Sequence, residues 1–145
     1  MDLEDVAVSY QKILSADRPT SVSLAKLTRG YAFAYQTLGF LLYRKGAPIV
    51  DDALLNELDD HLRRYVYEKI WEDTPQAERK ILAAIPSDGI RTKDLLAKTG
   101  CSREDYASYR DRLMKKGVLE SPIYGFIGFA LPRFYEFLRR KMDFE

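Results

Sequence analysis

The sequence predicts a mainly α protein, in which a helical bundle is followed by a unit that adds a small β-hairpin to its helices. One observation is that apolar residues recur at steps of three and four over most of the chain. A second is that Gly and Pro separate these periodic stretches. A third is a pair of short β-type runs, VLES and FIGFAL, on either side of Pro-Ile-Tyr-Gly.

The first half of the chain is expected to be entirely helical. Apolar periodicity predicts helices over residues 2–15, 21–30, 31–44 and 51–73. The last of these carries one apolar stripe, formed by Leu54, Leu55, Leu58, Leu62, Tyr65, Val66, Ile70 and Trp71. Thr74-Pro75 then begins a new helix over 76–85, with Thr74 as its N-cap. We therefore expect two domains, a helical bundle over residues 1–72 and a second domain over residues 73–145.

The second domain is organised around residues 92–132, which predict two helices and a hairpin. After a turn over residues 87–90, Thr92 is expected to cap a helix that ends at Gly100. Ser102 caps the next helix, which ends at Gly117. Strands over 118–121 and 126–131 follow, and then a last helix over 132–145. Two helices joined by a tight turn and followed by a hairpin are typical of a winged-helix domain.

The amino-acid composition is typical of a water-soluble globular protein. The 145 residues are 46% hydrophobic and 31% charged, with a formal net charge of +1. Residues 1–74 carry nine Lys/Arg and twelve Asp/Glu, whereas residues 75–145 carry fourteen and ten, so the basic excess lies in the second half. The single Cys excludes an intramolecular disulfide, and no apolar run is long enough to span a bilayer. We expect a cytoplasmic protein without a membrane partner.

The sequence offers no convergent catalytic or metal-binding set. His61 is the one histidine, and its helix position is typical of a boundary residue. Cys101 is expected to fill a helix–turn–helix corner, although the nearby Arg103 could lower the pKa of its thiol. Asp59 and Asp60 are expected on a solvated helix face without an obvious partner. We predict no catalytic residue and no metal site, so this chain alone is not expected to be an enzyme.

Residues 24–46 carry a resemblance to a known family. LAKLTRGYAFAYQTLGFLLYRKG resembles the T-x-G-Y-P-Y-x-x-Q-x-x-G segment in the lid of bacterial and archaeal AAA ATPases related to the origin-recognition type. The matching positions are Thr28, Gly30, Tyr31, Phe33, Gln36 and Gly39, while Ala32 stands where the family prefers proline. Later parts of the chain are similar to the family's C-terminal end, namely a long helix, Thr-Pro, YR-x-RL-x-x-KG and ALPRF. The resemblance therefore covers essentially the whole chain.

This resemblance implies the C-terminal part of an ATPase, a lid plus a winged helix that couples nucleotide state to a DNA or protein partner. The chain has no Walker A sequence, G-x-x-x-x-G-K-S/T, so ATP and Mg²⁺ would belong to a missing AAA core domain. Within this chain, Arg29, Gly30 and Tyr31 would then lie nearest to the nucleotide. A free-standing winged-helix DNA-binding regulator and a protein–protein interaction module are the alternatives.

The helix over 102–116 supplies the candidates for contact with double-stranded DNA. If Tyr106, Tyr109 and Leu113 face the core, then Arg103, Ser108 and Arg112 face outward. Glu104 and Asp105 would repel phosphate, and the hairpin from Val118 to Ala130 has no Lys or Arg. Its apolar residues, Tyr124 and Phe126 in particular, are instead candidates for docking a protein. Arg110 is expected either to form an ion pair with Asp94 or Glu120, or to extend outward.

Overall fold

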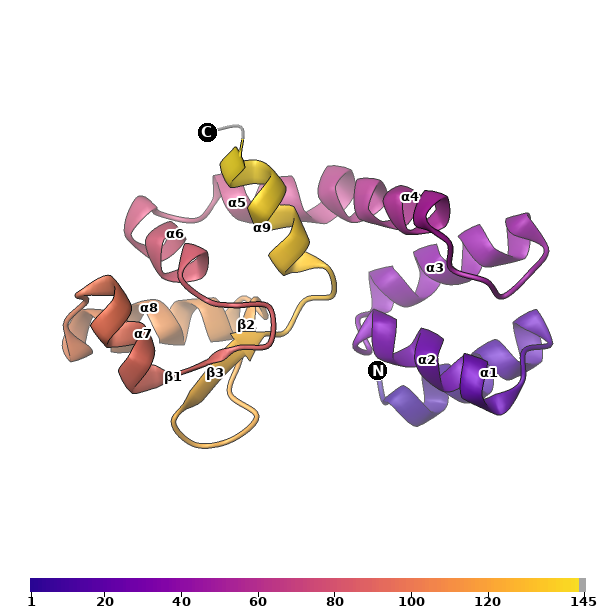
Figure 1. The fold of residues 1–145 in the computed structure, drawn as a ribbon, viewed down its shortest axis with the longest axis horizontal. Coiled ribbons are helices and arrows are strands. Elements are labelled where there is room, and N and C mark those ends of the chain that lie inside the picture. The colour runs from indigo at the N-terminus through magenta and orange to yellow at the C-terminus, as the bar shows by residue number, and fades with distance from the viewer. Residues whose placement is uncertain (144–145) are drawn as a thin grey trace. The chain divides into compact units, whose positions relative to one another are not determined.

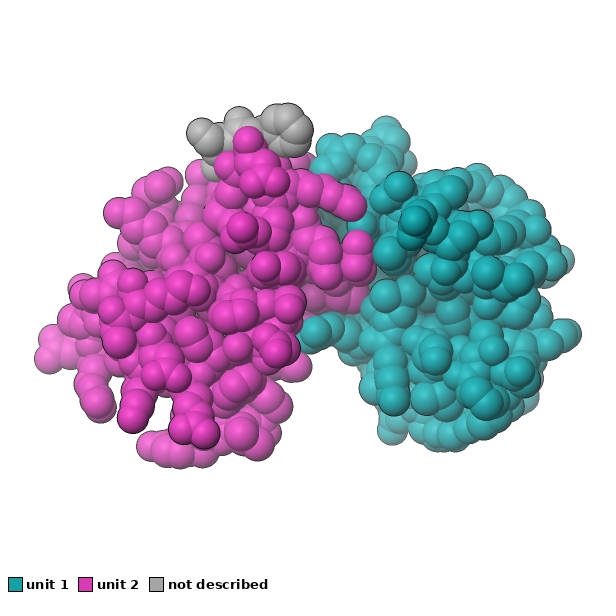
Figure 2. Space-filling model, viewed as in Figure 1, with its two compact units in different colours: residues 1–67 teal, residues 68–145 magenta. Residues whose placement is uncertain are grey.

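The computed structural model describes residues 1–143, which are mainly helical with a small three-stranded antiparallel sheet (Figure 1). This confirms the mainly α prediction. The chain divides into two compact units, residues 1–67 and residues 68–145 (Figure 2), whereas the sequence placed the boundary between residues 72 and 73. Of the helices in residues 1–143, none is long and apolar enough to cross a membrane.

Unit 1 is helical throughout. Its elements are α1 (Leu3–Leu14), α2 (Arg18–Thr28), α3 (Ala32–Lys45), α4 (Asp52–Leu62) and the π-helical segment η1 (Arg63–Tyr67). Aspartates begin three of these helices, because the carboxylates of Asp2, Asp17 and Asp51 accept from backbone N–H groups in the first turn. The apolar steps of the sequence form the core, which includes Val6, Tyr10, Leu24, Leu38, Leu42, Leu58 and Leu62.

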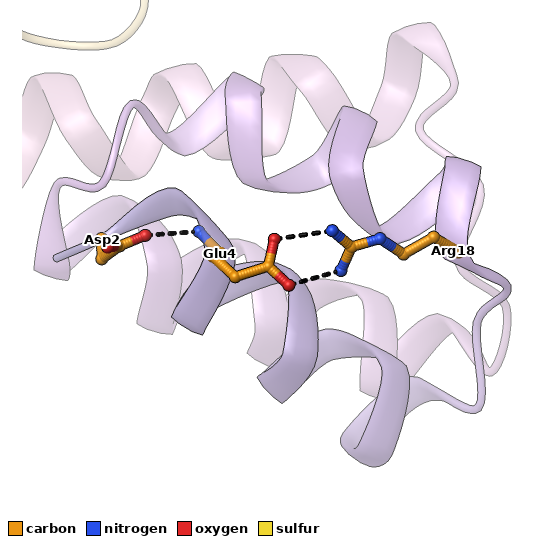
Figure 3. A network of polar contacts seen from close by, with 3 residues as sticks. All are labelled: Asp2, Glu4 and Arg18. Carbon is orange, nitrogen blue, oxygen red and sulfur yellow. Dashed lines mark hydrogen bonds and ion pairs between the residues drawn. The ribbon is translucent and has the colours of Figure 1, made fainter.

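An ion pair ties α1 to α2 at the surface of unit 1. The guanidinium of Arg18 donates from both terminal nitrogens to the Glu4 carboxylate, at 2.9 and 2.6 Å, and Asp2 accepts from the Glu4 backbone N–H (Figure 3). The Arg18 guanidinium lowers the pKa of Glu4. Helix α2 begins at Arg18 and not at residue 21 as predicted, because Asp17 caps it and Pro19 fits its first turn.

The apolar stripe predicted for residues 51–73 is wrong at Tyr65. That side chain is 63% exposed, whereas Tyr67 is 1% exposed and takes the place in the core. The reason is η1, since a π-helical turn contains one more residue than an α-helical turn and therefore shifts every later side chain around the axis. Helix α5 (Glu68–Glu72) follows directly in the chain.

Unit 2 continues with α6 (Gln76–Ala83), β1 (Ile90–Arg91), α7 (Thr92–Thr99), α8 (Arg103–Lys115), β2 (Leu119–Glu120), β3 (Phe126–Phe129) and α9 (Phe134–Asp143). The strands are antiparallel in the order β1-β3-β2, with Ile90 opposite Ile127 and Leu119 opposite Phe129. Helix α6 packs against both α7 and α9. The predicted helix over 132–145 is α9, and its expected last residues, 144 and 145, lie outside the described part.

The core of unit 2 confirms the helical pattern of the sequence. Leu95, Tyr106 and Leu113 are buried, and Tyr109 is half-buried. Phe134, Phe137 and Leu138 of α9 are also buried, as the spacing of the last helix predicts. Ser102 caps α8 by accepting from the Asp105 backbone N–H at 3.1 Å, and Gly100 ends α7.

Two predicted N-caps are wrong. The Thr74 hydroxyl donates to the Ile70 carbonyl oxygen at 2.5 Å, so it serves the end of α5, and Pro75 occupies the cap position of α6. Thr92 is the first residue of α7, because the extended Arg91 precedes it and the Thr92 N–H donates to the Gly125 carbonyl oxygen at 2.9 Å.

The strand predictions also change at their ends. The turn predicted over 87–90 contributes Ile90 to β1, and β2 and β3 are shorter than the runs 118–121 and 126–131. Strand β1 was missed because its two residues form a strand only by pairing with β3.

Candidate functional site

A hollow of about 930 Å³ opens in unit 2 between the start of α7, one side of α8 and the β2–β3 loop. We call it the basic hollow. Its lining residues are Arg91, Thr92, Lys93, Leu96, Arg103, Tyr106, Ala107, Ser108, Arg110, Asp111, Ser121, Tyr124 and Gly125. Three segments that are distant in sequence therefore supply one concave surface.

Hydrogen bonds and strand pairing join two of these segments, the start of α7 and the β2–β3 loop. The Thr92 N–H donates to the Gly125 carbonyl oxygen, which fixes the first turn of α7 to the end of the β2–β3 loop. Arg91 lies opposite Phe126 in the β1–β3 ladder. The Ser121 hydroxyl donates to the Phe126 carbonyl oxygen at 2.7 Å, which closes the base of the loop. The loop that lines one side of the hollow is thus anchored to β3 by Ser121 and to the start of α7 by Gly125.

Positive charge dominates the basic hollow. Four lining side chains, Arg91, Lys93, Arg103 and Arg110, are cationic, and within residues 1–143 none of them forms an ion pair. The one lining carboxylate, Asp111, is paired with Lys115 at 2.9 Å. The carboxylates of the described residues therefore do not neutralise these cations, and their combined field favours an anionic ligand.

Tyr106 and Arg110 are the least exposed polar residues of α8 that line the hollow. They are four residues apart, so they lie on the same side of the helix, one turn from each other. Tyr106 is 4% exposed, and its buried hydroxyl has no hydrogen-bond partner among the described residues. Arg110 is half-buried and forms neither of the ion pairs, with Asp94 or Glu120, that the sequence suggested.

The structure separates the three residues predicted to contact DNA. Arg103 and Ser108 line the basic hollow. Arg112 does not: its Nε atom lies 3.3 Å from Oε2 of the buried Glu78 on α6, and its guanidinium lies 5.5 Å from the ring centroid of Tyr109. Arg112 is exposed, as the helical wheel of α8 predicts, but the wheel cannot show the Glu78 carboxylate that α6 presents to it.

The two predicted docking residues also differ. Tyr124 is fully exposed in the β2–β3 loop beside the exposed Ile123. Phe126 is half-buried, and its ring packs over Gly89, where a Cβ atom would lie only 2.5 Å from Phe126 Cε1. Tyr124 is therefore free to meet a partner, whereas Phe126 holds the turn before β1.

The residues that the AAA resemblance places near a nucleotide lie in unit 1, between α2 and α3. Arg29 is the left-handed C-cap of α2, and Tyr31 is the N-cap residue of α3. Gly30 is buried, and its carbonyl oxygen accepts from the Met1 ammonium at 2.7 Å. Burial raises the pKa of Tyr31. A nucleotide contact by these residues stays a prediction.

The residues considered for catalysis have structural surroundings. Cys101 is half-buried, and burial, followed by the charge of Asp105, raises the pKa of its thiol, so Arg103 does not activate it. His61 donates from Nδ1 to the Glu57 carbonyl oxygen at 2.8 Å. No group of three or more His, Cys, Asp or Glu side chains in the described chain could hold a metal ion.

The predicted solvated pair, Asp59 and Asp60, is also corrected. Asp59 is buried. Asp60 is paired with Arg63 at 2.5 Å and has Arg64 at 3.7 Å, and the Arg63 guanidinium lowers the pKa of Asp60. The Asp60 carboxylate therefore links the end of α4 to two arginines of η1.

Sequence reasoning missed Arg91 and Lys93 as site residues. They flank Thr92, which looked like a simple helix cap, and the β1 strand that carries Arg91 could not be recognised locally. The sequence did contain one indication of the hollow: Tyr106 and Arg110 of α8 are four residues apart, the spacing of side chains on one helix face.

Comparison with known proteins identifies a family. Residues 64–138 match the family model described as "Domain of unknown function (DUF8462)". The chain belongs to this family. The DUF8462 region contains every residue that lines the basic hollow, since these lie between Arg91 and Gly125. No curated protein and no solved structure matches the chain.

Proposed function

We propose that unit 2 has a winged-helix arrangement and binds double-stranded DNA through the basic hollow and the adjoining side of α8. The order of elements supports this proposal, because α7 and α8 are joined by a short turn and followed by the β2–β3 hairpin. In such an arrangement the second helix of the pair enters the major groove, and contacts to phosphates set its position.

The observation that carries the proposal is a group of four cations around one hollow, none of which has an ion-pair partner in the part of the chain that the structure describes. A cation that already has a carboxylate partner gains less from a phosphate, because the partner must first be displaced. Arg91, Lys93 and Arg103 are exposed, so they can reach a DNA backbone with little rearrangement. The small net charge of the whole chain does not oppose this, because binding depends on how charge is distributed locally.

Acidic residues near the start of α8 limit which part of the helix can approach DNA. Glu104 and Asp105 are exposed but do not line the hollow, and Asp111 is compensated by Lys115. The supported geometry is therefore one in which the phosphates lie over the hollow, on the side of α8 that carries Arg103, and away from Glu104 and Asp105.

A second candidate is protein docking by the β2–β3 loop. It is favoured by the exposed Ile123 and Tyr124 and by the absence of Lys and Arg from residues 118–130. DNA binding is preferred because the loop presents two apolar side chains, whereas the hollow beside it presents four cations that have no ion-pair partner among the described residues. Coupling of this unit to an ATPase core that binds ATP and Mg²⁺ rests on the sequence resemblance alone and stays a prediction.

Fluorescence anisotropy with a labelled duplex of about 20 base pairs tests the proposal, with a dissociation constant of about 1–100 µM expected at physiological salt. Replacing Arg103 or Lys93 with Ala weakens binding on duplexes of unrelated sequence alike. The matched control is Lys80→Ala, an exposed lysine on α6 outside the hollow, which leaves binding unchanged. Equal losses for Lys80 and Arg103 variants, or no binding by the unmodified protein, would overturn the proposal.

A further inference from the structure

We propose that the basic hollow contains a seat for one phosphate group, formed on α8 by Arg110 with Tyr106. This deepens the DNA-binding function and rests on it for the source of the phosphate, which would be the backbone of the duplex. The same chemistry would suit a free phosphate or a nucleotide, so the test must separate these sources.

The first step of the argument is the position of Arg110. It is half-buried, whereas Arg91, Lys93 and Arg103 are exposed, so Arg110 is the cation least surrounded by water in the hollow. It has no carboxylate partner within residues 1–143. The N–H groups of a guanidinium match two phosphate oxygens. Where the guanidinium has less contact with water, its attraction to a phosphate is stronger because the local dielectric constant is lower.

The second step is the Tyr106 hydroxyl. Buried polar groups in folded proteins almost always have a hydrogen-bond partner, and a missing partner lowers stability. Tyr106 lines the hollow one helix turn before Arg110, and its hydroxyl has no partner among the described residues. An oxygen of a ligand held by Arg110 would supply this partner once the side chains rearrange to bring the hydroxyl into contact with it.

The third step is the remaining lining of the hollow. Thr92 on α7 and Ser108 on α8 contribute further hydroxyl groups, which can donate to phosphate oxygens. Asp111, the one carboxylate in the lining, is held by Lys115. The set therefore combines one recessed cation, a buried hydroxyl and a rim of exposed cations, which fits a single compact anion with several acceptor oxygens.

The proposed phosphate site is tested by titrating the full chain with inorganic phosphate and recording ¹H–¹⁵N NMR spectra. A parallel titration with sodium chloride of equal ionic strength is the control. A seat predicts saturable shifts of the Arg110 Nε–H and the Ser108 amide with phosphate only. Arg110→Met abolishes the saturation, and Tyr106→Phe weakens phosphate affinity by about 2- to 10-fold without lowering the melting temperature. Lys80→Ala leaves the titration unchanged, and unshifted peaks elsewhere show that each variant is folded.

A second arm identifies the source of the phosphate. Adding duplex DNA to the phosphate-saturated protein reverses the Arg110 shift if the seat holds a backbone phosphate. If phosphate saturates the site but the duplex neither binds the protein nor displaces the phosphate, the proposed site is supported as a site for free phosphate. The proposed DNA-binding function is then overturned. If phosphate and chloride give the same unsaturated shifts while duplex still binds, the seat is overturned and the DNA-binding function stands.

Discussion

Replacing Gly89 with Ala tests the turn that holds β1, and with it Arg91, at the rim of the basic hollow. Gly89 has φ +90°, a backbone conformation that costs an L-residue about 1–2 kcal/mol. A Cβ atom there would also lie 2.5 Å from Phe126 Cε1 and 2.7 Å from the Ile127 carbonyl oxygen. The Phe126 ring can move, but the Ile127 carbonyl belongs to β3 and cannot, so overpacking adds about 1–3 kcal/mol.

The matched control is Gly100→Ala. Gly100 also has a positive φ, +71°, but a Cβ atom there would meet nothing within 4 Å, so only the backbone cost of about 1–2 kcal/mol applies. We therefore expect Gly89→Ala to lower the free energy of unfolding of unit 2 by about 2–5 kcal/mol. The assay is urea unfolding followed by the fluorescence of the single tryptophan, Trp71, which is buried in unit 2.

Equal losses of stability in the two glycine variants would refute this reasoning. They would mean that the close approach of Gly89 to β3 does not exist in solution. The β1–β3 pairing, and the position of Arg91 beside the hollow, would then lack support.

Two further predictions concern residues outside the hollow. Because burial raises the pKa of Cys101, its thiol should react with iodoacetamide more slowly at about pH 7.5 than free cysteine does, and a faster reaction would contradict the environment described for it. Arg112→Ala should lower the free energy of unfolding by about 1–3 kcal/mol, since it leaves the buried Glu78 carboxylate without this partner. The same change should leave the salt dependence of DNA binding by the folded protein unaltered, and a reduced dependence would place Arg112 in the interface after all.

Local sequence features predicted a helix well where its ends and its buried face depend only on its own residues. The apolar steps of α1 and α3 and the Ser102 cap of α8 need no information from elsewhere in the chain. The π-helical turn was not predictable in this way, because its extra residue disturbs the α-helical period on which the stripe was based. The burial of Tyr67 in place of Tyr65 follows from that turn.

The site was predicted only in part for a related reason. Arg103 and Ser108 line the hollow, as their outward positions on α8 led us to expect, and their contact with DNA stays a prediction. Arg91 lines the hollow because it lies in β1, a strand that forms only by pairing with β3. Arg112 does not line the hollow and instead contacts Glu78 of α6. A residue whose role depends on a second element cannot be assigned from the periodicity of its own element.

The dependence of duplex affinity on salt concentration tests the central claim most directly. If the four cations of the basic hollow each neutralise one phosphate, the logarithm of the association constant falls against the logarithm of salt concentration with a slope of about −3.6. Replacing Arg103 with Ala should make the slope shallower by about 0.9, and Lys80→Ala should not change it. A slope near zero, or one that Arg103→Ala leaves unchanged, would contradict DNA binding through the basic hollow.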